Sequence, residues 1–160
     1  MSSHDSEAEP IATVLVYSDD SSIRERVKLA LGRRPASDVP RVEYIETATE
    51  PACVKHLDSA VVDLAILDGE AAPAGGLGVC KAAKNEVYDC PPILVMIGRA
   101  QDAWLANWSQ ADAVVSYPLD PIKLAEASAR LLRTRLGHVL ESDAAAVPAL
   151  EAPAVEAPAT

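Results

Sequence analysis

The chain has 160 residues, the length of one domain, and a formal net charge of −10 from 14 basic and 24 acidic residues. Residues 1–10 carry three acidic residues, residues 141–160 carry four, and neither segment has Lys or Arg. That leaves 17 acidic and 14 basic residues in 11–140, a net charge of −3. No cluster of basic residues could neutralise phosphates, so we expect no nucleic-acid-binding surface.

The sequence carries no targeting or membrane signal. No apolar run approaches the roughly 20 residues of a membrane span, and the acidic N-terminus resembles neither a secretory signal nor a transit peptide. Cys53, Cys80 and Cys90 form no close pair, which argues against a disulfide framework or a zinc site and fits a reducing cytosol. We therefore expect a cytoplasmic protein without direct membrane insertion.

Short apolar runs alternate with amphipathic segments along the chain. The first run, 13–17, precedes a helix that Asp20, Ser21 or Ser22 can cap and that Gly32 ends. Each later run is also followed by a helical pattern, which indicates repeated strand–helix units. The later strands are predicted at 42–45, 61–67, 93–97 and 113–116, and the later helices begin near Thr49, Leu77, Trp104 and Asp120, the last reaching about Gly137.

Five strands, each followed by a helix, predict an α/β fold: a doubly wound five-stranded parallel sheet in the order 2-1-3-4-5, with helices on both faces. We divide the chain into a disordered acidic N-terminus (1–10), this domain (11–140) and an extended tail rich in Ala, Pro and Glu (141–160). The near-repeat in 148–160 has too little apolar surface for a core of its own.

Acidic residues follow two neighbouring strands at their carboxyl ends, where ligands bind in such sheets. Asp19 and Asp20 follow the first strand, and Asp68 follows the third. Converging carboxylates repel one another and recruit a hard cation such as Mg²⁺, and a metal-neutralised carboxylate can attack phosphorus. The alternative is that these acids only cap helices and end strands.

Residues 11–137 resemble the receiver domain of response regulators in two-component signalling. The resemblance implies a CheY-like, flavodoxin-like fold, which agrees with the strand order predicted above. It rests on Ser18-Asp19-Asp20, on Leu67-Asp68 followed by Gly76-Leu77, on Gly98 after the fourth strand, and on Ala111-Asp112, Pro118 and Asp120-Pro121 around the fifth.

The resemblance also implies roles for individual residues. Asp68 matches the aspartate that accepts a phosphoryl group, and a histidine kinase is the corresponding partner. Asp19 matches the acid that binds Mg²⁺ directly, and Glu70 matches the position whose backbone carbonyl usually completes the metal site. Asp19, Asp68 and Glu70 therefore form the candidate metal site. Ser18 stands where the family usually has another acid.

Three departures from the family pattern concern the switch that phosphorylation operates. Active receivers carry Ser or Thr at the position of Ile97, an aromatic residue at that of Val114 and Lys at that of Tyr117. Without the hydroxyl and the lysine, nothing in the sequence converts added phosphoryl charge into movement of a bistable element. We predict a degenerate, stand-alone (orphan) receiver, or pseudo-receiver, that is not an enzyme and acts by binding proteins.

Two other functions remain open at this point. One is a phosphorylatable single-domain response regulator of a phosphorelay, which accepts phosphate at Asp68. The other is a flavodoxin-like module that binds a small molecule, with the Gly75–Gly78 segment at a helix start cradling an anion.

The first candidate surface for a partner protein is the predicted fourth helix. Trp104 and Trp108 lie four residues apart, and Trp is frequent at binding hot spots. We expect one to be buried and one partly exposed, with Tyr117 and Leu119 extending the patch; the alternative is that both are core residues.

The second candidate is the tail, where Val147, Leu150 and Val155 could lie extended along a partner's groove. The alternative is a solvated tail that only aids solubility. Similar orphan receivers of actinobacteria imply an accessory subunit of a larger assembly, such as respiratory complex I (NADH dehydrogenase). Such a partner would hold the protein at the membrane periphery.

Overall fold

The computed structural model describes residues 9–141. Its sheet has five parallel strands in the order β2-β1-β3-β4-β5, which confirms the predicted topology. The strands are β1 (Ile11–Tyr17), β2 (Arg41–Thr47), β3 (Leu64–Asp68), β4 (Ile93–Ile97) and β5 (Ala113–Ser116). The helices are α1 (Ser21–Leu31), α2 (Glu50–Ser59), α3 (Gly76–Glu86), the 3₁₀ turn η1 (Ala100–Asp102), α4 (Ala103–Ser109) and α5 (Pro121–Glu141).

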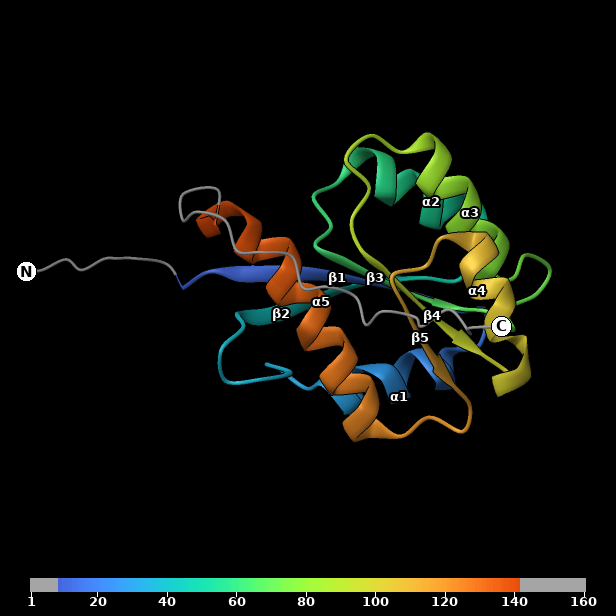
Figure 1. Ribbon diagram of the computed structural model, residues 1–160, viewed down its shortest axis with the longest axis horizontal. Coiled ribbons are helices and arrows are strands. Elements are labelled where there is room, and N and C mark those ends of the chain that lie inside the picture. The colour runs from blue at the N-terminus through green and yellow to red at the C-terminus, as the bar shows by residue number, and fades with distance from the viewer. Residues whose placement is uncertain (1–8, 142–160) are drawn as a thin grey trace, which may run out of the picture.

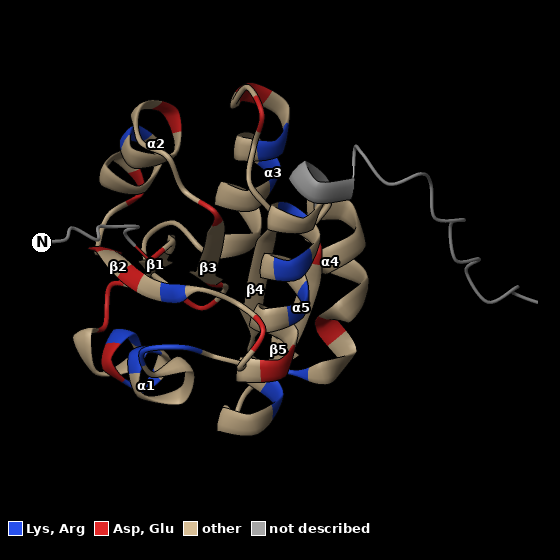
Figure 2. Cartoon of the chain, turned by 90° about the vertical axis from the view of Figure 1, so that its left-hand side faces the viewer, with Lys and Arg blue, Asp and Glu red and all other residues tan. Residues whose placement is uncertain are grey.

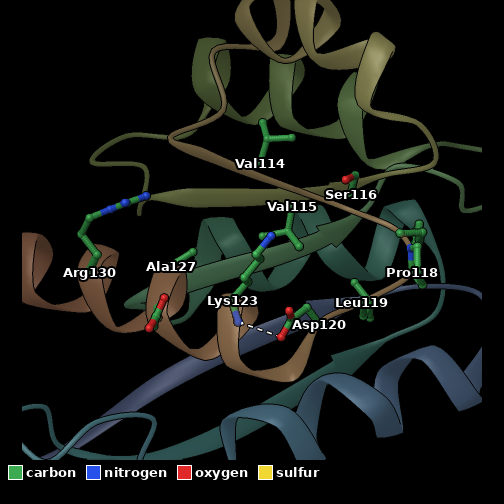
Figure 3. Close-up of a pocket in the computed structure, with 11 residues that line it drawn as sticks. Val114, Val115, Ser116, Pro118, Leu119, Asp120, Lys123, Ala127 and Arg130 are labelled. Atoms are coloured by element: carbon green, nitrogen blue, oxygen red, sulfur yellow. Dashed lines mark hydrogen bonds between the residues drawn. The ribbon is translucent and has the colours of Figure 1, made fainter. Parts of the chain in front are cut away.

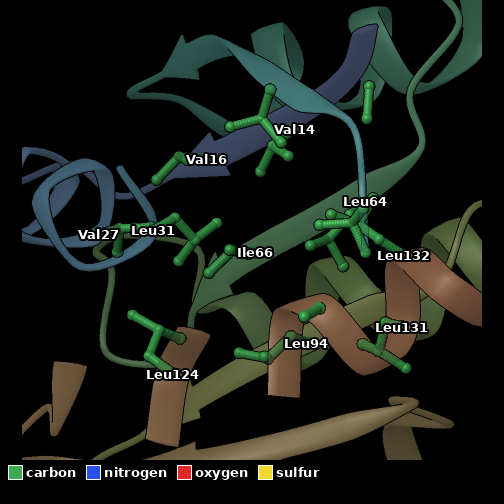
Figure 4. Packing of buried hydrophobic residues seen from close by; sticks show 14 of the residues in the cluster. Val14, Val16, Val27, Leu31, Leu64, Ile66, Leu94, Leu124, Leu131 and Leu132 are labelled. Atoms are coloured by element: carbon green, nitrogen blue, oxygen red, sulfur yellow. The ribbon is translucent and has the colours of Figure 1, made fainter. Parts of the chain in front are cut away.

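Helices cover both faces of the sheet: α1 and α5 lie on one face, and α2, α3 and α4 lie on the other (Figure 1). Side chains alternate along the strands, so Val14 and Val16 of β1 pack on the α1–α5 side whereas Leu15 packs on the opposite side. In the α1–α5 cluster, Leu94 of β4 and Leu124 of α5 are fully buried (Figure 4). Every residue of β3 and β4 is buried, as expected for strands covered on both faces.

The ends of the helices follow from local side-chain chemistry. Of the three candidate caps of α1, Asp20 is the N-cap, and its Oδ1 accepts a hydrogen bond from the Ser22 backbone N–H at 2.9 Å. A second bond from the Ser22 hydroxyl, at 2.7 Å, lowers the pKa of the Asp20 carboxyl. Gly32 ends the helix with a φ of 65°, which glycine adopts without steric cost.

Two boundaries differ from the sequence prediction. β3 begins at Leu64 and not at Val61, because Asp63 turns its carboxylate to the start of β1 and accepts the Thr13 backbone N–H at 2.9 Å. α5 continues past Gly137 to Glu141. A glycine inside a helix costs only about 1 kcal/mol, so it need not end one.

Basic and acidic residues are interspersed over α1, α3 and α5 (Figure 2). Several pair with one another across elements, as Arg133 of α5 does with Asp38 at 2.7 Å. None of the helices within residues 9–141 is both long and apolar enough to cross a membrane.

Candidate functional site

The residues predicted to meet at the carboxyl end of the sheet do so. Ser18 follows β1, Asp68 ends β3, Gly98 follows β4 and Tyr117 follows β5. Hydrogen bonds join Ser18 and Tyr117 to Asp68, and the Glu70 carboxylate to the Gly98 backbone N–H. These three hydrogen bonds join residues that are 28 to 50 positions apart in the chain.

Asp68 lies at the centre of this site with only 3% of its surface exposed. Its Oδ2 accepts the Ser18 hydroxyl at 2.7 Å, and its Oδ1 accepts the Tyr117 phenol at 2.8 Å and the Glu70 backbone N–H at 2.9 Å. Three internal donors therefore compensate the cost of burying the carboxylate. Oδ1 thus accepts two hydrogen bonds and Oδ2 accepts one.

The Tyr117 side chain is held in place from both ends. Its backbone N–H donates to the Ile97 carbonyl at 2.9 Å, and its ring packs against the core cluster under α1 and α5. Burial, and then the hydrogen bond to Asp68, raises the pKa of the Tyr117 phenol. The hydroxyl therefore keeps its proton at neutral pH and remains a donor to Asp68.

Ser18 is fully buried and connects Asp68 to the start of α1. While its hydroxyl donates to Asp68, its Oγ accepts the Asp20 backbone N–H at 3.0 Å. The Arg24 guanidinium donates to the Ser18 carbonyl at 2.6 Å. At a position where an acid would repel Asp68, this neutral side chain supplies a donor.

The remaining acids of the candidate metal site secure the loop between β3 and α3. Asp19 Oδ1 accepts the Ala72 backbone N–H at 3.2 Å, and Glu70 Oε2 accepts the Gly98 backbone N–H at 3.1 Å. Tyr17 strengthens the same loop by donating to the Ala74 carbonyl at 2.5 Å. Hence Asp19 and Glu70 each hold a backbone amide.

The carboxylates are of the chemical type that Mg²⁺ binds. Nevertheless, within the described part of the chain no three His, Cys, Asp or Glu side chains gather closely enough to hold a metal ion. The predicted site uses only two carboxylates, those of Asp19 and Asp68, because Glu70 would contribute its backbone carbonyl. Mg²⁺ at these three residues stays a prediction.

Comparison with known proteins identifies the family. No protein-family model matches the sequence. Two curated relatives, each described as an uncharacterized response regulatory protein of a Mycobacterium tuberculosis strain, are 52% identical over 120 residues, 75% of this chain and 90% of the relative. The chain belongs to the response-regulator receiver family.

Solved receivers share the fold of this receiver at lower sequence identity. A CheY-like response regulator receiver domain protein of Methanospirillum hungatei is 19% identical, with a TM-score of 0.65 over 81% of this chain and 99% of its own. The chemotaxis response regulator CheY4 of Vibrio cholerae is 22% identical, with a TM-score of 0.65 over 76% of this chain and 99% of its own.

The two other switch positions of this receiver carry apolar side chains. Ile97 ends β4 with 2% of its surface exposed, and it packs in the core cluster under α2, α3 and α4. Val114 of β5 is half-buried against the same cluster. Neither can donate a hydrogen bond toward Asp68.

The glycines that follow β3 in this receiver have a packing role. A Cβ on Gly76 would lie 2.8 Å from the Asp68 carbonyl oxygen, and one on Gly75 would lie 2.7 Å from the Gly69 carbonyl oxygen. Close approach of backbone therefore requires glycine at both positions. This packing accounts for both glycines, and no bound anion is needed to explain them.

The tryptophans of the receiver are both exposed, Trp104 by 66% and Trp108 by 50%, so the expectation that one is buried is wrong. The buried side of α4 consists of Ala106 and Ser109. Residues four apart share one face of a helix, so Trp104 and Trp108 point to the same side. The Lys81 ammonium of α3 lies 5.3 Å from the centre of the Trp108 ring, within the range of a cation–π contact.

Tyr117 and Leu119 do not extend the tryptophan patch as expected. Both are half-buried against the cluster under α1 and α5, in the other helix layer from α4. The cause is that Tyr117 turns inward to Asp68. Val147, Leu150 and Val155 lie outside the described residues.

The sequence shows Tyr117 where active receivers carry lysine, but it did not predict the hydrogen bond from Tyr117 to Asp68. It also missed the Ser18 bond to the same carboxylate. The available signal was chemical: both residues carry hydroxyl donors at positions expected to border the acceptor.

Proposed function

We propose that this receiver acts as a protein-binding accessory protein without a working phosphorylation switch. The observation that carries the proposal is the bond from the Tyr117 phenol to Asp68 Oδ1, at the position where active receivers carry lysine. At this position the receiver has a neutral donor that already holds the acceptor carboxylate. The position therefore offers no cation that could move when a phosphoryl group adds negative charge to Asp68.

Charge supports this proposal. A phosphoryl group adds up to about two negative charges at neutral pH. Among the described residues, the donors to Asp68 are Ser18, Tyr117 and the Glu70 backbone, and none of them is cationic. None of these donors could form an ion pair with a phosphoryl group on Asp68. Phosphorylation by a histidine kinase is therefore the disfavoured alternative.

The exposed α4 face supports a binding role. Trp104 and Trp108 present aromatic surface on one side of a short helix, and Lys81 adds a positive charge beside it. We propose that this α4 patch contacts a larger assembly, with respiratory complex I as one candidate. The receiver would then be cytoplasmic, peripheral to the membrane through that partner, and without catalytic activity of its own.

The absence of a switch is tested by adding Mg²⁺ and beryllofluoride, a phosphoryl mimic, while recording amide NMR spectra. We expect no change, or changes confined to residues next to Asp68. The Asp68→Asn variant is the control for specific binding. Large shifts that spread to β5 in the wild type and disappear in the variant would overturn the proposal.

The accessory role is tested by affinity capture from the native source with the Trp104→Ala/Trp108→Ala variant. Tyr88→Ala is the matched control, because Tyr88 is 94% exposed and lies off α4. We expect wild type and control to recover the same defined complex, with complex I subunits as the specific candidates, and the double variant to lose it. Equal recovery by all three proteins would contradict the assignment of the α4 patch.

A further inference from the structure

Two surface hollows of the receiver each contain a serine, and the two serines differ in exposure. The hollow of about 760 Å³ between β5 and α5 contains Ser116, which is half-buried at the end of a strand (Figure 3). The hollow of about 370 Å³ beside the loop that joins α1 to β2, residues 32–40, contains Ser37, which is exposed. Of the two hydroxyl groups, the one in the α1–β2 loop is therefore accessible to another protein.

Two arginines precede Ser37 at a spacing that protein kinases recognise. Arg33 and Arg34 lie four and three residues before it, in the segment Arg-Arg-Pro-Ala-Ser. Kinases that select basic substrates bind such arginines with carboxylates of their substrate groove, because a guanidinium pairs with a carboxylate through two parallel hydrogen bonds. No other Ser or Thr of the sequence has arginine three residues before it. The pattern therefore singles out one hydroxyl group.

The middle of the α1–β2 loop is only loosely attached to the domain. Within residues 33–38, four residues are exposed and two are half-buried. Two backbone hydrogen bonds close the loop, from the Val39 N–H to the Ala36 carbonyl at 3.3 Å and from the Val42 N–H to the Arg33 carbonyl at 2.9 Å. None of the backbone N–H groups of residues 34–38 donates to a backbone carbonyl of the described chain. Extending this segment in the groove of a kinase therefore costs little.

Cations near Ser37 are available to a phosphate group. Arg34 lines the same hollow, and its Nη2 lies 3.5 Å from both carboxylate oxygens of Glu9, a long and exposed ion pair that contributes little to stability. The neighbouring Asp38 pairs with Arg133 of α5 at 2.7 and 2.9 Å. A phosphoserine brings up to about two negative charges and three acceptor oxygens, so it would compete with both carboxylates for their arginines.

We propose that Ser37 is a phosphorylation site for a serine/threonine kinase that selects arginine-containing segments. In this reaction the Ser37 Oγ bonds to the γ-phosphorus of ATP, the bond from that phosphorus to ADP breaks, and the hydroxyl proton passes to a carboxylate of the kinase. The phosphate then draws Arg34 from Glu9 and weakens the contact of Asp38 with α5. Unlike Asp68, Ser37 thus lies where added charge meets cations. The site is independent of the proposed accessory role.

The first test is phosphorylation of the purified full chain by the catalytic subunit of a kinase that requires arginine three residues before the acceptor, with labelled ATP. We expect one phosphate per chain, located at Ser37 by tandem mass spectrometry. The Arg33→Ala/Arg34→Ala variant should lower kcat/KM by about tenfold or more, because two charged contacts with the kinase are lost. The control, Arg26→Ala/Arg130→Ala, replaces two exposed arginines elsewhere and should leave kcat/KM unchanged.

Thr134 provides a control within the same chain. Arg130 and Arg133 precede it, but it lies inside α5, where its hydroxyl donates to the Arg130 carbonyl at 3.2 Å. Its segment would have to leave the helix to enter a kinase groove, so we expect no phosphate there. Equal labelling of Thr134 and Ser37 would mean that nearby arginines decide the reaction without the loop, and it would overturn the proposal.

Two further measurements concern the native kinase and the effect of the phosphate. A soluble extract of the native source, supplied with labelled ATP, should label the wild type and not Ser37→Ala. In NMR spectra, phosphorylation should shift the guanidinium resonances of Arg34 and Arg133, while Ser37→Ala treated in the same way should show no change. The proposal fails if Ser37 is not labelled, if the Arg33→Ala/Arg34→Ala variant reacts as fast as the wild type, or if both guanidinium resonances stay in place.

Discussion

The carboxyl end of the sheet and the side formed by β5 and α4 differ in where their functional groups point. Polar groups at the carboxyl end bond to other parts of the chain, whereas aromatic groups on α4 face solvent. At the carboxyl end, Asp19, Asp68 and Glu70 each accept hydrogen bonds from within the chain. On the β5–α4 side, Trp104 is two-thirds exposed, and no strand within residues 9–141 pairs with the outer side of β5. The groups at the positions that carry chemistry in active receivers are thus held by internal hydrogen bonds, whereas the periphery presents aromatic surface to solvent.

The largest expected loss of stability comes from a substitution at Gly76, which packs against the backbone of Asp68. The variant Gly76→Val places a Cβ 2.8 Å from the Asp68 carbonyl oxygen and 2.9 Å from the Leu67 Cβ, in a buried position. We expect it to lower the free energy of unfolding by about 3 kcal/mol, measured by urea denaturation.

Gly78 in the same helix is the matched control, because a Cβ there meets nothing within 4 Å. Gly78→Ala should raise the free energy of unfolding by about 0.5–1 kcal/mol, since alanine favours the helix. Similar destabilisation by both variants would mean that the loop next to Asp68 is not tightly packed.

A smaller effect is expected when the hydroxyl of Tyr117 is removed. Tyr117→Phe leaves Asp68 Oδ1 with one donor fewer, which should cost about 1–3 kcal/mol at neutral pH. Tyr88→Phe, at a 94% exposed position, is the control and should change nothing. If the two variants are equally stable in urea, the phenol does not hold the buried carboxylate.

The stabilities of Tyr117→Phe and Tyr88→Phe should also depend differently on pH under alkaline conditions. The pKa of Tyr117 is raised in the folded protein, so the unfolded chain releases the phenol proton first, near the ordinary value of 10.0. The stabilising contribution of this group is complete below that pH and is lost as the pH rises further. Stability should therefore fall less steeply above pH 10 in Tyr117→Phe than in the wild type or in Tyr88→Phe.

The sequence was sufficient for those features that depend on local pattern. The continuous apolar runs of β3 and β4 predicted buried parallel strands, and acids at strand ends predicted the place of the site. The Tyr117–Asp68 bond joins residues 49 positions apart and depends on which way a ring turns after β5. No local pattern encodes that direction, so sequence reasoning could register a missing lysine but not its replacement.

The tryptophans show a second limit of local pattern. Their spacing of four residues places Trp104 and Trp108 on one helix face, which contradicts an expectation of one buried and one exposed ring. Which face of a seven-residue helix turns inward depends on the sheet beneath it. Here the small residues Ala106 and Ser109 pack inward, and the large rings remain outside.

The smallest expected effect on stability comes from replacing the exposed tryptophans of α4. Trp104→Ala should change the free energy of unfolding by no more than about 0.5 kcal/mol, because its ring is mostly in water. Trp108→Ala should cost about 0.5–1 kcal/mol, since it also loses the Lys81 contact. Leu94→Ala, at a fully buried position, should cost about 2–5 kcal/mol by the same urea measurement.

Acrylamide quenching of tryptophan fluorescence gives an independent measurement of the same surface. Each single tryptophan variant leaves one indole, and both remaining indoles should be readily quenched in the folded protein, Trp104 more strongly than Trp108. A protected indole, or a loss of stability comparable to that of Leu94→Ala, would place the tryptophans in the core. Free quenching together with near-neutral stability would leave binding as the physical reason for two large apolar side chains on this helix, since folding does not need them.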